Sequence, residues 1–148
     1  MNEQLDYSRL NQPRIGVGVI GYGFMGKVHS NAYLKIPYAY RDPAAYPQLI
    51  AMAGRDRTAL VDTARRFGYR SVYTDWRELV RDPGVSIVDN CTPDDLHAEA
   101  SIAALEAGKH VVCEGGVERY DATLRTAIGP RSSWRPSQSP RKRGKGSK

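Results

Sequence analysis

Short apolar runs with strand character alternate with helical patterns five times along this chain, and this alternation restricts the fold more than any other feature. The runs cover residues 15–20, 48–54, 70–74, 85–93 and 110–114. Segments with helical spacing or helix stop signals lie at residues 24–34, 56–68, 75–84 and 94–108. Strands and helices that alternate at this spacing form parallel sheets with right-handed crossovers. We therefore expect an α/β fold with a Rossmann-type, doubly wound parallel sheet of about five strands.

We draw further expectations from two of the apolar runs and from two of the helical segments. "VSIVDNCTP" has an unbroken apolar centre, as in a strand covered on both faces, and "HVVCE" is predicted to be a short buried strand. We expect Asp94 or Asp95 to cap the helix that follows residue 93. The first helix places apolar residues at helical spacing, and so does the fourth: Phe24, Val28, Ala32 and Leu34 in one, and Leu96, Ala100, Ala103 and Leu105 in the other.

The length of 148 residues allows one domain with a hydrophobic core and is too short to promise two. We expect a flexible segment at residues 1–13, a folded domain at 14–128 and a disordered basic tail at 129–148. No apolar run approaches the length that spans a membrane, and the first residues lack the apolar core of a secretory signal. A cytoplasmic, soluble protein without a membrane partner is predicted.

The net charge of +6 would suggest a nucleic-acid partner if it were spread over the domain. Seven of the 22 Lys and Arg residues, and none of the 16 acids, lie in residues 129–148, which leaves 15 cations against 16 acids in residues 1–128. The domain itself is therefore not basic. A cationic tail of Ser, Pro and Gly is usually only solvated, so binding of nucleic acid ranks last among the functions considered.

The two cysteines have neither the spacing of a disulfide framework nor a Cys/His partner nearby in the sequence. We expect Cys91 and Cys113 to be reduced core thiols without a zinc site. His29 and His110 are likewise expected to be surface or capping residues rather than catalysts.

A glycine motif lies where the first strand becomes the first helix. Residues 21–26, "GYGFMG", fit the pattern GxGxxG, with Phe24 and Met25 between the last two glycines. In this context Gly21 permits the tight turn, Gly23 lets the backbone approach a pyrophosphate and Gly26 lets helix and sheet pack closely. The N-terminus of the helix adds N–H groups and a partial positive charge. The motif predicts a dinucleotide cofactor.

The end of the second strand bears on which dinucleotide binds. An NAD site usually has a carboxylate here, whereas an NADP site has a small residue and a cation. Gly54 offers no carboxylate and Arg55 could pair with a 2′-phosphate, so NADP is slightly favoured. Asp56 could instead serve NAD, or Arg55 and Asp56 could be solvated loop charges.

The segment "CTPDDLH" closes the fourth strand at the expected switch point of the sheet. Cys91, Thr92 and Pro93 are therefore predicted to lie on the nicotinamide side of the cofactor, together with His97. A lone histidine in a first helical turn is more often a surface or capping residue than a catalyst. This is the alternative interpretation of His97.

These segments together resemble the N-terminal domain of the glucose-fructose oxidoreductase / inositol dehydrogenase / MocA family. "VGVIGYGFMGKVHSNAY", "AGRDR" and "VDNCTPDDLHAEASIAALEAGKHVVCE" follow the family pattern in order and spacing over residues 14–114. The resemblance implies an oxidoreductase that moves hydride between nicotinamide and a sugar, polyol or related hydroxy compound. It also implies that Glu114 lies near the nicotinamide end.

The chain departs from the family pattern after Glu114. The resemblance puts a lysine next, which contacts cofactor and substrate and assists proton transfer, and a proline after it; this chain has Gly115 and Gly116. No catalytic residue is therefore assigned, and no segment corresponds to the family's substrate domain. We expect an inactive, truncated or frame-shifted product, with a non-catalytic sensor or partner subunit as the alternative. Self-association through an exposed apolar edge or face is a further expectation.

Overall fold

The structure is a computed structural model that describes residues 12–41 and 43–114. Five strands alternate with the helices in chain order. The strands are β1 (Arg14–Ile20), β2 (Tyr46–Ala53), β3 (Ser71–Tyr73), β4 (Ile87–Asn90) and β5 (His110–Cys113). The helices are α1 (Phe24–Ala39), α2 (Arg57–Phe67), α3 (Trp76–Arg81) and α4 (His97–Glu106), with the short 3-10 helix η2 (Asp94–Leu96) leading into α4. The predicted disordered tail and most of the predicted flexible N-terminal segment lie outside the described residues.

All strand pairs in the sheet are parallel, in the order β3-β2-β1-β4-β5. The chain leaves β1 toward one edge through α1 and α2, and then returns past β1 to build the other edge. This reversal places a switch point between β1 and β4, at the carboxyl ends of the strands, where open α/β sheets bind ligands. The predicted doubly wound parallel sheet is confirmed.

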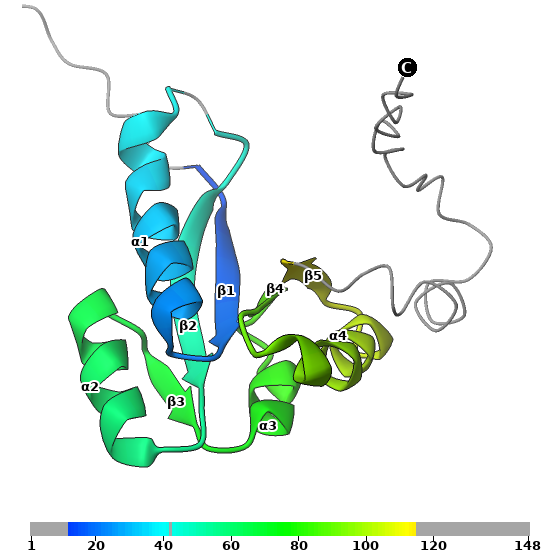
Figure 1. Cartoon of the computed structure of the whole chain (residues 1–148). Helices are drawn as coiled ribbons and strands as arrows, with labels where there is room; N and C mark the ends of the chain where they lie inside the picture. Colours follow the sequence, from blue (N-terminus) through cyan, green and yellow to red (C-terminus); the bar gives the residue numbers. More distant parts are fainter. Residues whose placement is uncertain (1–11, 42, 115–148) are drawn as a thin grey trace, which may run out of the picture.

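Helices cover both faces of the sheet and make two separate cores (Figure 1). On the face of α1 and α2, Leu60 packs with Val17, Val19 and Met52. On the face of α3 and α4, Leu79 and Ala104 pack with the residues of β2 and β4 that point the other way. The alternation of side chains along each strand thus supplies both cores, as expected for strands buried on two faces.

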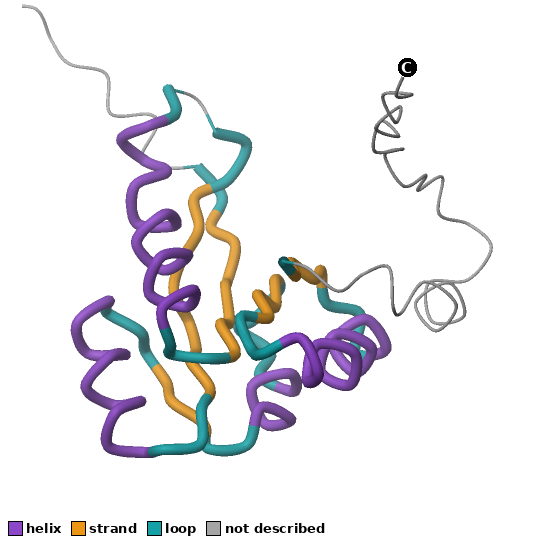
Figure 2. Tube along the Cα trace, in the orientation of Figure 1, coloured by secondary structure: helices purple, strands orange, loops and turns teal. Residues whose placement is uncertain are grey.

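Local sequence signals begin and end α2. Asp56 is its N-cap, and the Asp56 side chain accepts hydrogen bonds from the backbone N–H groups of Thr58 and Ala59. Gly68 ends the helix in a left-handed conformation with φ of 79°. The loops at these caps are short: one joins β2 to α2, and the other joins α2 to β3 (Figure 2).

Several expectations at the level of elements were wrong. Neither Asp94 nor Asp95 is the N-cap of α4, because η2 precedes the helix and the cap is Leu96. The strand β5 is not buried: it lies at an edge of the described sheet, where Val112 is 39% exposed.

The apolar spacing of α1 does not mark its buried face. Its predicted apolar residues Phe24, Val28, Ala32 and Leu34 are exposed, and α1 packs on the sheet through the small residues Gly26 and Ser30. In α4, by contrast, Ala100 is buried as the spacing suggests, whereas Leu96 is exposed. Within residues 12–41 and 43–114, no helix is long and apolar enough to cross a membrane.

Candidate functional site

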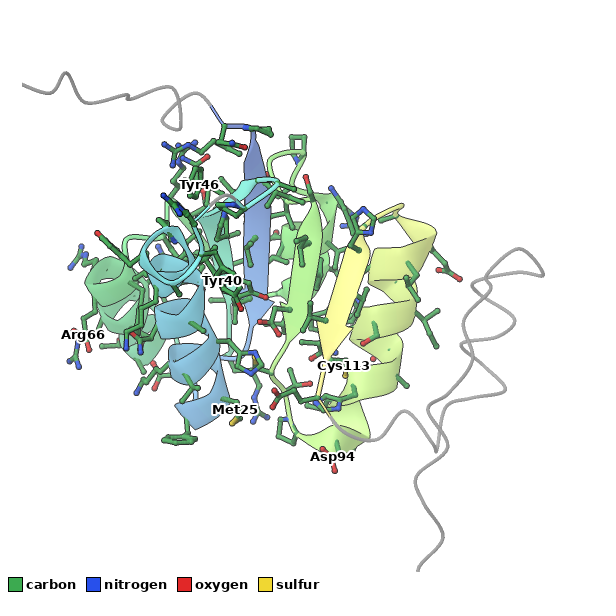
Figure 3. The ribbon with its side chains drawn as sticks, turned by 90° about the horizontal axis from the view of Figure 1, so that it is seen from above. Met25, Tyr40, Tyr46, Arg66, Asp94 and Cys113 are labelled. Carbon is green, nitrogen blue, oxygen red and sulfur yellow. The ribbon has the colours of Figure 1, made fainter. Side chains whose placement is uncertain are left out.

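The predicted site residues come from the carboxyl ends of four strands and from the start of α1. Figure 3 shows Met25, Asp94 and Cys113 at this end of the sheet, whereas Tyr46, which begins β2, lies at the opposite end. These residues are far apart in the chain and come together because all five strands run in the same direction.

The turn between β1 and α1 is tightly fixed by backbone contacts. The N–H of Gly21 donates to the carbonyl of Ala53 at 2.8 Å, and Gly21 has φ of 103°. A Cβ on Gly21 would lie 2.7 Å from the carbonyl oxygen of Cys91, and one on Gly26 would lie 1.9 Å from the carbonyl oxygen of Gly21. The turn therefore touches the end of β4, and α1 sits directly on it.

Gly23 differs from these two glycines, because a Cβ added there would meet no heavy atom within 4 Å. Gly23 is the N-cap of α1, no side-chain cap hydrogen bond is made there, and the first turn holds no acidic residue. The first N–H groups of an α-helix have no partner within the helix, so this end presents donors and a partial positive charge to an open space. Such a surface fits a phosphate or pyrophosphate group.

The loop after β2 leaves its cations exposed and uses its carboxylate in the fold. A Cβ on Gly54 would lie 2.2 Å from the ring of Tyr22, so only glycine lets this ring lie against the strand end. Arg55 is exposed. Asp56 caps the N-terminus of α2 through its Oδ1, a structural role that was not among the alternatives predicted for this carboxylate from the sequence.

Buried side chains hold the loop after β4 in place. The Asn90 amide donates to the carbonyl of His97 at 3.0 Å and to Ser101 Oγ at 3.1 Å. Asn90 Oδ1 accepts from Thr92 Oγ1 at 2.7 Å, and His97 Nε2 donates to the carbonyl of Thr92. Thr92 is therefore fixed from both sides, with the exposed Pro93 next to it.

His97 is not a surface residue, because it is 3% exposed, but it is the C-cap of η2, so only the surface part of its alternative was wrong. Its Nε2 must carry the proton, since a carbonyl only accepts. Its buried Nδ1 has no hydrogen-bond partner among the described residues, and Asp94 Oδ1 lies 3.9 Å away.

A second group of polar side chains, which the sequence did not reveal, surrounds the buried carboxylate of Asp89 in β4. His29 of α1 contacts Asp89 Oδ2 through Nδ1 at 2.8 Å and Glu114 Oε1 through Nε2 at 3.2 Å. Tyr33, one turn further along α1, donates its hydroxyl to Asp89 Oδ2 at 2.9 Å. The Cys91 thiol donates to Asp89 Oδ1 at 3.4 Å. We call His29, Tyr33, Asp89, Cys91 and Glu114 the Asp89 cluster.

Protons are held firmly in this cluster. Burial first, and then the charge of Asp89, raise the pKa of Tyr33 and of the Cys91 thiol. Burial lowers the pKa of His29, but its contacts with Asp89 and Glu114 outweigh burial and raise that pKa above the usual value. Tyr33 and Cys91 are therefore neutral at pH 7, and His29 favours its charged form.

Three donor types of the cluster could in principle bind a metal ion. Ligand atoms of His29, Asp89 and Cys91 lie within 4.8 Å of one another. These atoms already hydrogen-bond one another, with Cys91 Sγ 3.3 Å from His29 Nδ1. A metal would also need the Cys91 thiolate, which burial and then the carboxylate of Asp89 disfavour by raising the pKa of Cys91. The arrangement is that of a hydrogen-bonded network rather than of a metal centre.

The structure thus brings most of the predicted residues to one edge of the sheet and revises the role of His29. Gly21, Gly23, Phe24, Met25 and Gly26 form the turn, and the loops after β2 and β4 add Gly54, Arg55, Cys91, Thr92, Pro93 and His97, with Glu114 after β5. Gly115 lies outside the described residues. Both cysteines are free, but they are half-buried rather than part of the core that was expected for them. His110 is exposed at the start of β5, whereas His29 is half-buried in the Asp89 cluster.

Comparison with known proteins bears on the function of the residues at the carboxyl ends of the strands. The model of an oxidoreductase family with an NAD-binding Rossmann fold, GFO_IDH_MocA, matches residues 15–115. The chain belongs to this family. The resemblance drawn from the sequence is confirmed.

Two of the similar proteins are named for a sugar derivative and a polyol. Levoglucosan dehydrogenase of Pseudarthrobacter phenanthrenivorans is 44% identical over 105 residues, 71% of this chain and 27% of that protein. Myo-inositol 2-dehydrogenase of Thermotoga maritima is 33% identical over 98 residues, 66% of this chain and 27% of that protein. A solved structure of levoglucosan dehydrogenase in complex with NADH superposes with a TM-score of 0.74 at 39% identity, covering 78% of this chain and 32% of that one. The chain thus spans about a third or less of the length of these relatives.

Proposed function

We propose that residues 14–114 bind a nicotinamide dinucleotide at the carboxyl edge of the sheet. The observation that carries this proposal is the open space at Gly23, on the uncapped N-terminus of α1 and beside the end of β4. In this proposal Gly21, Gly23 and Gly26 form the pyrophosphate cradle, with the backbone of Phe24 and Met25 as donors. Family membership and the NADH complex of levoglucosan dehydrogenase support it.

In this proposal, the other site residues contact the two ends of the cofactor. Arg55 with Gly54 lies on the adenine-ribose side, after β2. Thr92 and Pro93, together with Cys91 and His97 that hold their loop, lie on the nicotinamide side, and Glu114 approaches the same end from β5. The bound nicotinamide would supply the hydride chemistry. This chain's own residues bind and orient the cofactor, and the sequence places no proton donor at position 115.

The experiment that tests this proposal is titration with NADH, followed by nicotinamide fluorescence, for the full chain and for Gly23→Ala. Alanine fits the backbone of Gly23, with φ of −66° and ψ of −161°, and its methyl group touches no protein atom. The added methyl would fill the cradle, so we expect NADH affinity to fall by about tenfold or more, which corresponds to about 1.4 kcal/mol. Thermal unfolding should be unchanged. Equal affinity of the two chains, or no binding by the wild type, would contradict the proposal.

We further propose NADP(H) as the preferred cofactor. Gly54 has no carboxylate to repel a 2′-phosphate, Arg55 is exposed beside it, and Asp56 uses an oxygen to cap α2. The measurement is the ratio of NADPH to NADH affinity for the wild type and for Arg55→Ala. Loss of Arg55 should lower NADPH affinity while leaving NADH affinity nearly unchanged. An equal effect on both cofactors would argue against a 2′-phosphate contact.

For the whole protein we propose a dehydrogenase ancestry with a sugar, inositol or similar polyol as substrate, because two of the similar proteins are named as dehydrogenases of levoglucosan and myo-inositol. The chain by itself should bind cofactor and not turn over these substrates, since Gly115 takes the place of the expected lysine. A Gly115→Lys variant and the wild type, assayed with NAD(P) and levoglucosan or myo-inositol, test this. Turnover by the wild-type chain would contradict it.

A further inference from the structure

The contacts of His29 favour its protonated form by geometry. Its Nδ1 lies 2.8 Å from Asp89 Oδ2 and its Nε2 lies 3.2 Å from Glu114 Oε1. An ionised carboxylate only accepts hydrogen bonds, so each ring nitrogen must be a donor. Only the imidazolium has two donors, and the position of His29 between two carboxylates is therefore that of a cation.

This cation connects three elements at the edge where the cofactor is proposed to bind. His29 is three residues after Gly26 on α1, Asp89 is in β4, and Glu114 directly follows β5. The two carboxylates differ in exposure, because the Asp89 side chain is fully buried whereas that of Glu114 is 62% exposed. Asp89 is also held by Tyr33, so it is the fixed point of the chain of contacts. Glu114 is the end that His29 holds in place.

We propose that His29 is a positioning residue for the nicotinamide end of the cofactor: as an imidazolium anchored on Asp89, it holds the Glu114 carboxylate at the carboxyl edge of the sheet, so that cofactor binding depends on the protonation of His29. This inference rests on the proposed function. Neither the glycine motif nor the family match assigns a role to His29 or Asp89.

The charges that face His29 come from every element packed against it. β4 and its following loop contribute Asp89 and the neutral Cys91 thiol, and the end of β5 contributes Glu114. On its own helix, Tyr33 stays neutral and bonds the same carboxylate. Deprotonation of His29 would leave two carboxylates around a ring with a single donor. One of the two contacts would be lost, and the exposed Glu114 is the carboxylate that is free to move away.

These contacts determine how NADH affinity should change with pH. The pKa of His29 is raised above its ordinary value, because Asp89 and Glu114 outweigh burial. The positioned state is therefore complete at low pH and is lost as the pH rises through the pKa of His29 in the folded chain. The apparent Kd is the intrinsic Kd divided by the competent fraction, so NADH affinity should fall by up to about tenfold per pH unit above that pKa.

The first arm of the test follows the histidine rings in the unliganded full chain by NMR as a function of pH. His29→Asn identifies the signal of His29, and exposed His110 is the internal reference. Glu114→Gln should lower the pKa of His29, whereas the signal of His110 should be the same in the two chains. An unchanged pKa of His29 in this variant would overturn the contact on which the inference depends.

The second arm measures NADH affinity from pH 6 to 9 for the wild type and two amide variants. The amide nitrogen of asparagine lies close to the position of Nδ1 and that of glutamine close to the position of Nε2. His29→Asn thus keeps a donor toward Asp89 and loses the reach to Glu114, whereas His29→Gln does the reverse. Both lack the charge, so both should bind NADH more weakly than the wild type at pH 6 and with little pH dependence. His110→Gln should keep the wild-type profile.

The outcomes separate the inference from the proposed function. Binding by the wild type with an affinity that does not change through the titration of His29 would overturn the inference and leave the proposed function standing. Wild-type affinity and pH profile in His29→Asn would do the same. Absence of NADH and NADPH binding at any pH would overturn both.

Discussion

Gly26 and Gly23 lie three residues apart in one motif and serve different purposes. A Cβ on Gly26 would lie 1.9 Å from a backbone oxygen, whereas one on Gly23 would meet nothing within 4 Å. Gly26→Ala should therefore force α1 away from the turn and lower the free energy of unfolding by about 1–3 kcal/mol. Urea unfolding of the two alanine variants measures this, with Gly23→Ala as the matched control that stays within about 0.5 kcal/mol of the wild type. Similar stability of both variants would show that the turn adapts.

The stability of the chain should also report on His29. Its raised pKa means that the folded state binds the proton more tightly than the unfolded state, whose pKa is near the ordinary 6.5. The contribution of His29 to stability is therefore complete below about pH 6.5 and is lost as the pH rises through the higher pKa of the folded chain. Urea unfolding from pH 6 to 9 should show this decline in the wild type and not in His29→Gln. A decline of equal size in both would assign it to other groups.

Sequence reasoning missed His29 because its role depends on strand order. Residues 29, 89 and 114 meet only when β4 lies between β1 and β5. Two local signals were nevertheless present. Gly26, His29, Ser30 and Tyr33 share one face of α1, and Asp89 interrupts a strand covered on both faces, where a carboxylate needs buried partners.

At the scale of elements, variants at the N-cap of α2 distinguish a structural role of Asp56 from a role in cofactor binding. Its carboxylate accepts from two backbone N–H groups, so Asp56→Ala should lower the free energy of unfolding by about 1 kcal/mol. Asp56→Ser keeps an acceptor at the cap and should restore most of that loss. Neither variant should change the ratio of NADPH to NADH affinity. A selective loss of NADH binding in Asp56→Ser would show instead that the carboxylate also binds ribose.

Elements were predictable where their signals are local. The strand β1, the glycine turn and the ends of α2 follow from an apolar run, from glycine spacing, and from Asp56 and Gly68 as caps. The buried face of α1 was not predictable, because the apolar residues of this helix are exposed and it packs through Gly26 and Ser30. Spacing indicates a helix, but it does not show which side meets the sheet when small and polar residues make that contact.

For the whole molecule, the described unit combines a well-packed sheet with surfaces that remain apolar. Phe24 is 79% exposed at the start of α1, and Val112 is 39% exposed in the edge strand β5. Edge strands and exposed apolar residues favour association between chains. We predict that dimers or larger species form at high concentration, and that Val112→Lys reduces them. Sedimentation velocity over a range of concentrations measures this, and a monomer at all concentrations would contradict it.

The distribution of charge over the whole chain yields a last prediction. Residues 129–148 hold seven cations and no acid, whereas residues 1–128 carry a net charge of −1. Any attraction to nucleic acid should therefore come from the tail, and should be non-specific and sensitive to salt. With seven phosphate contacts, duplex affinity would fall by about 6,000-fold between 50 and 200 mM salt. Deleting residues 129–148 should abolish binding to a duplex at low salt and leave NADH affinity unchanged. Duplex binding by the shortened chain would instead require a cationic surface on the domain, which its net charge does not suggest.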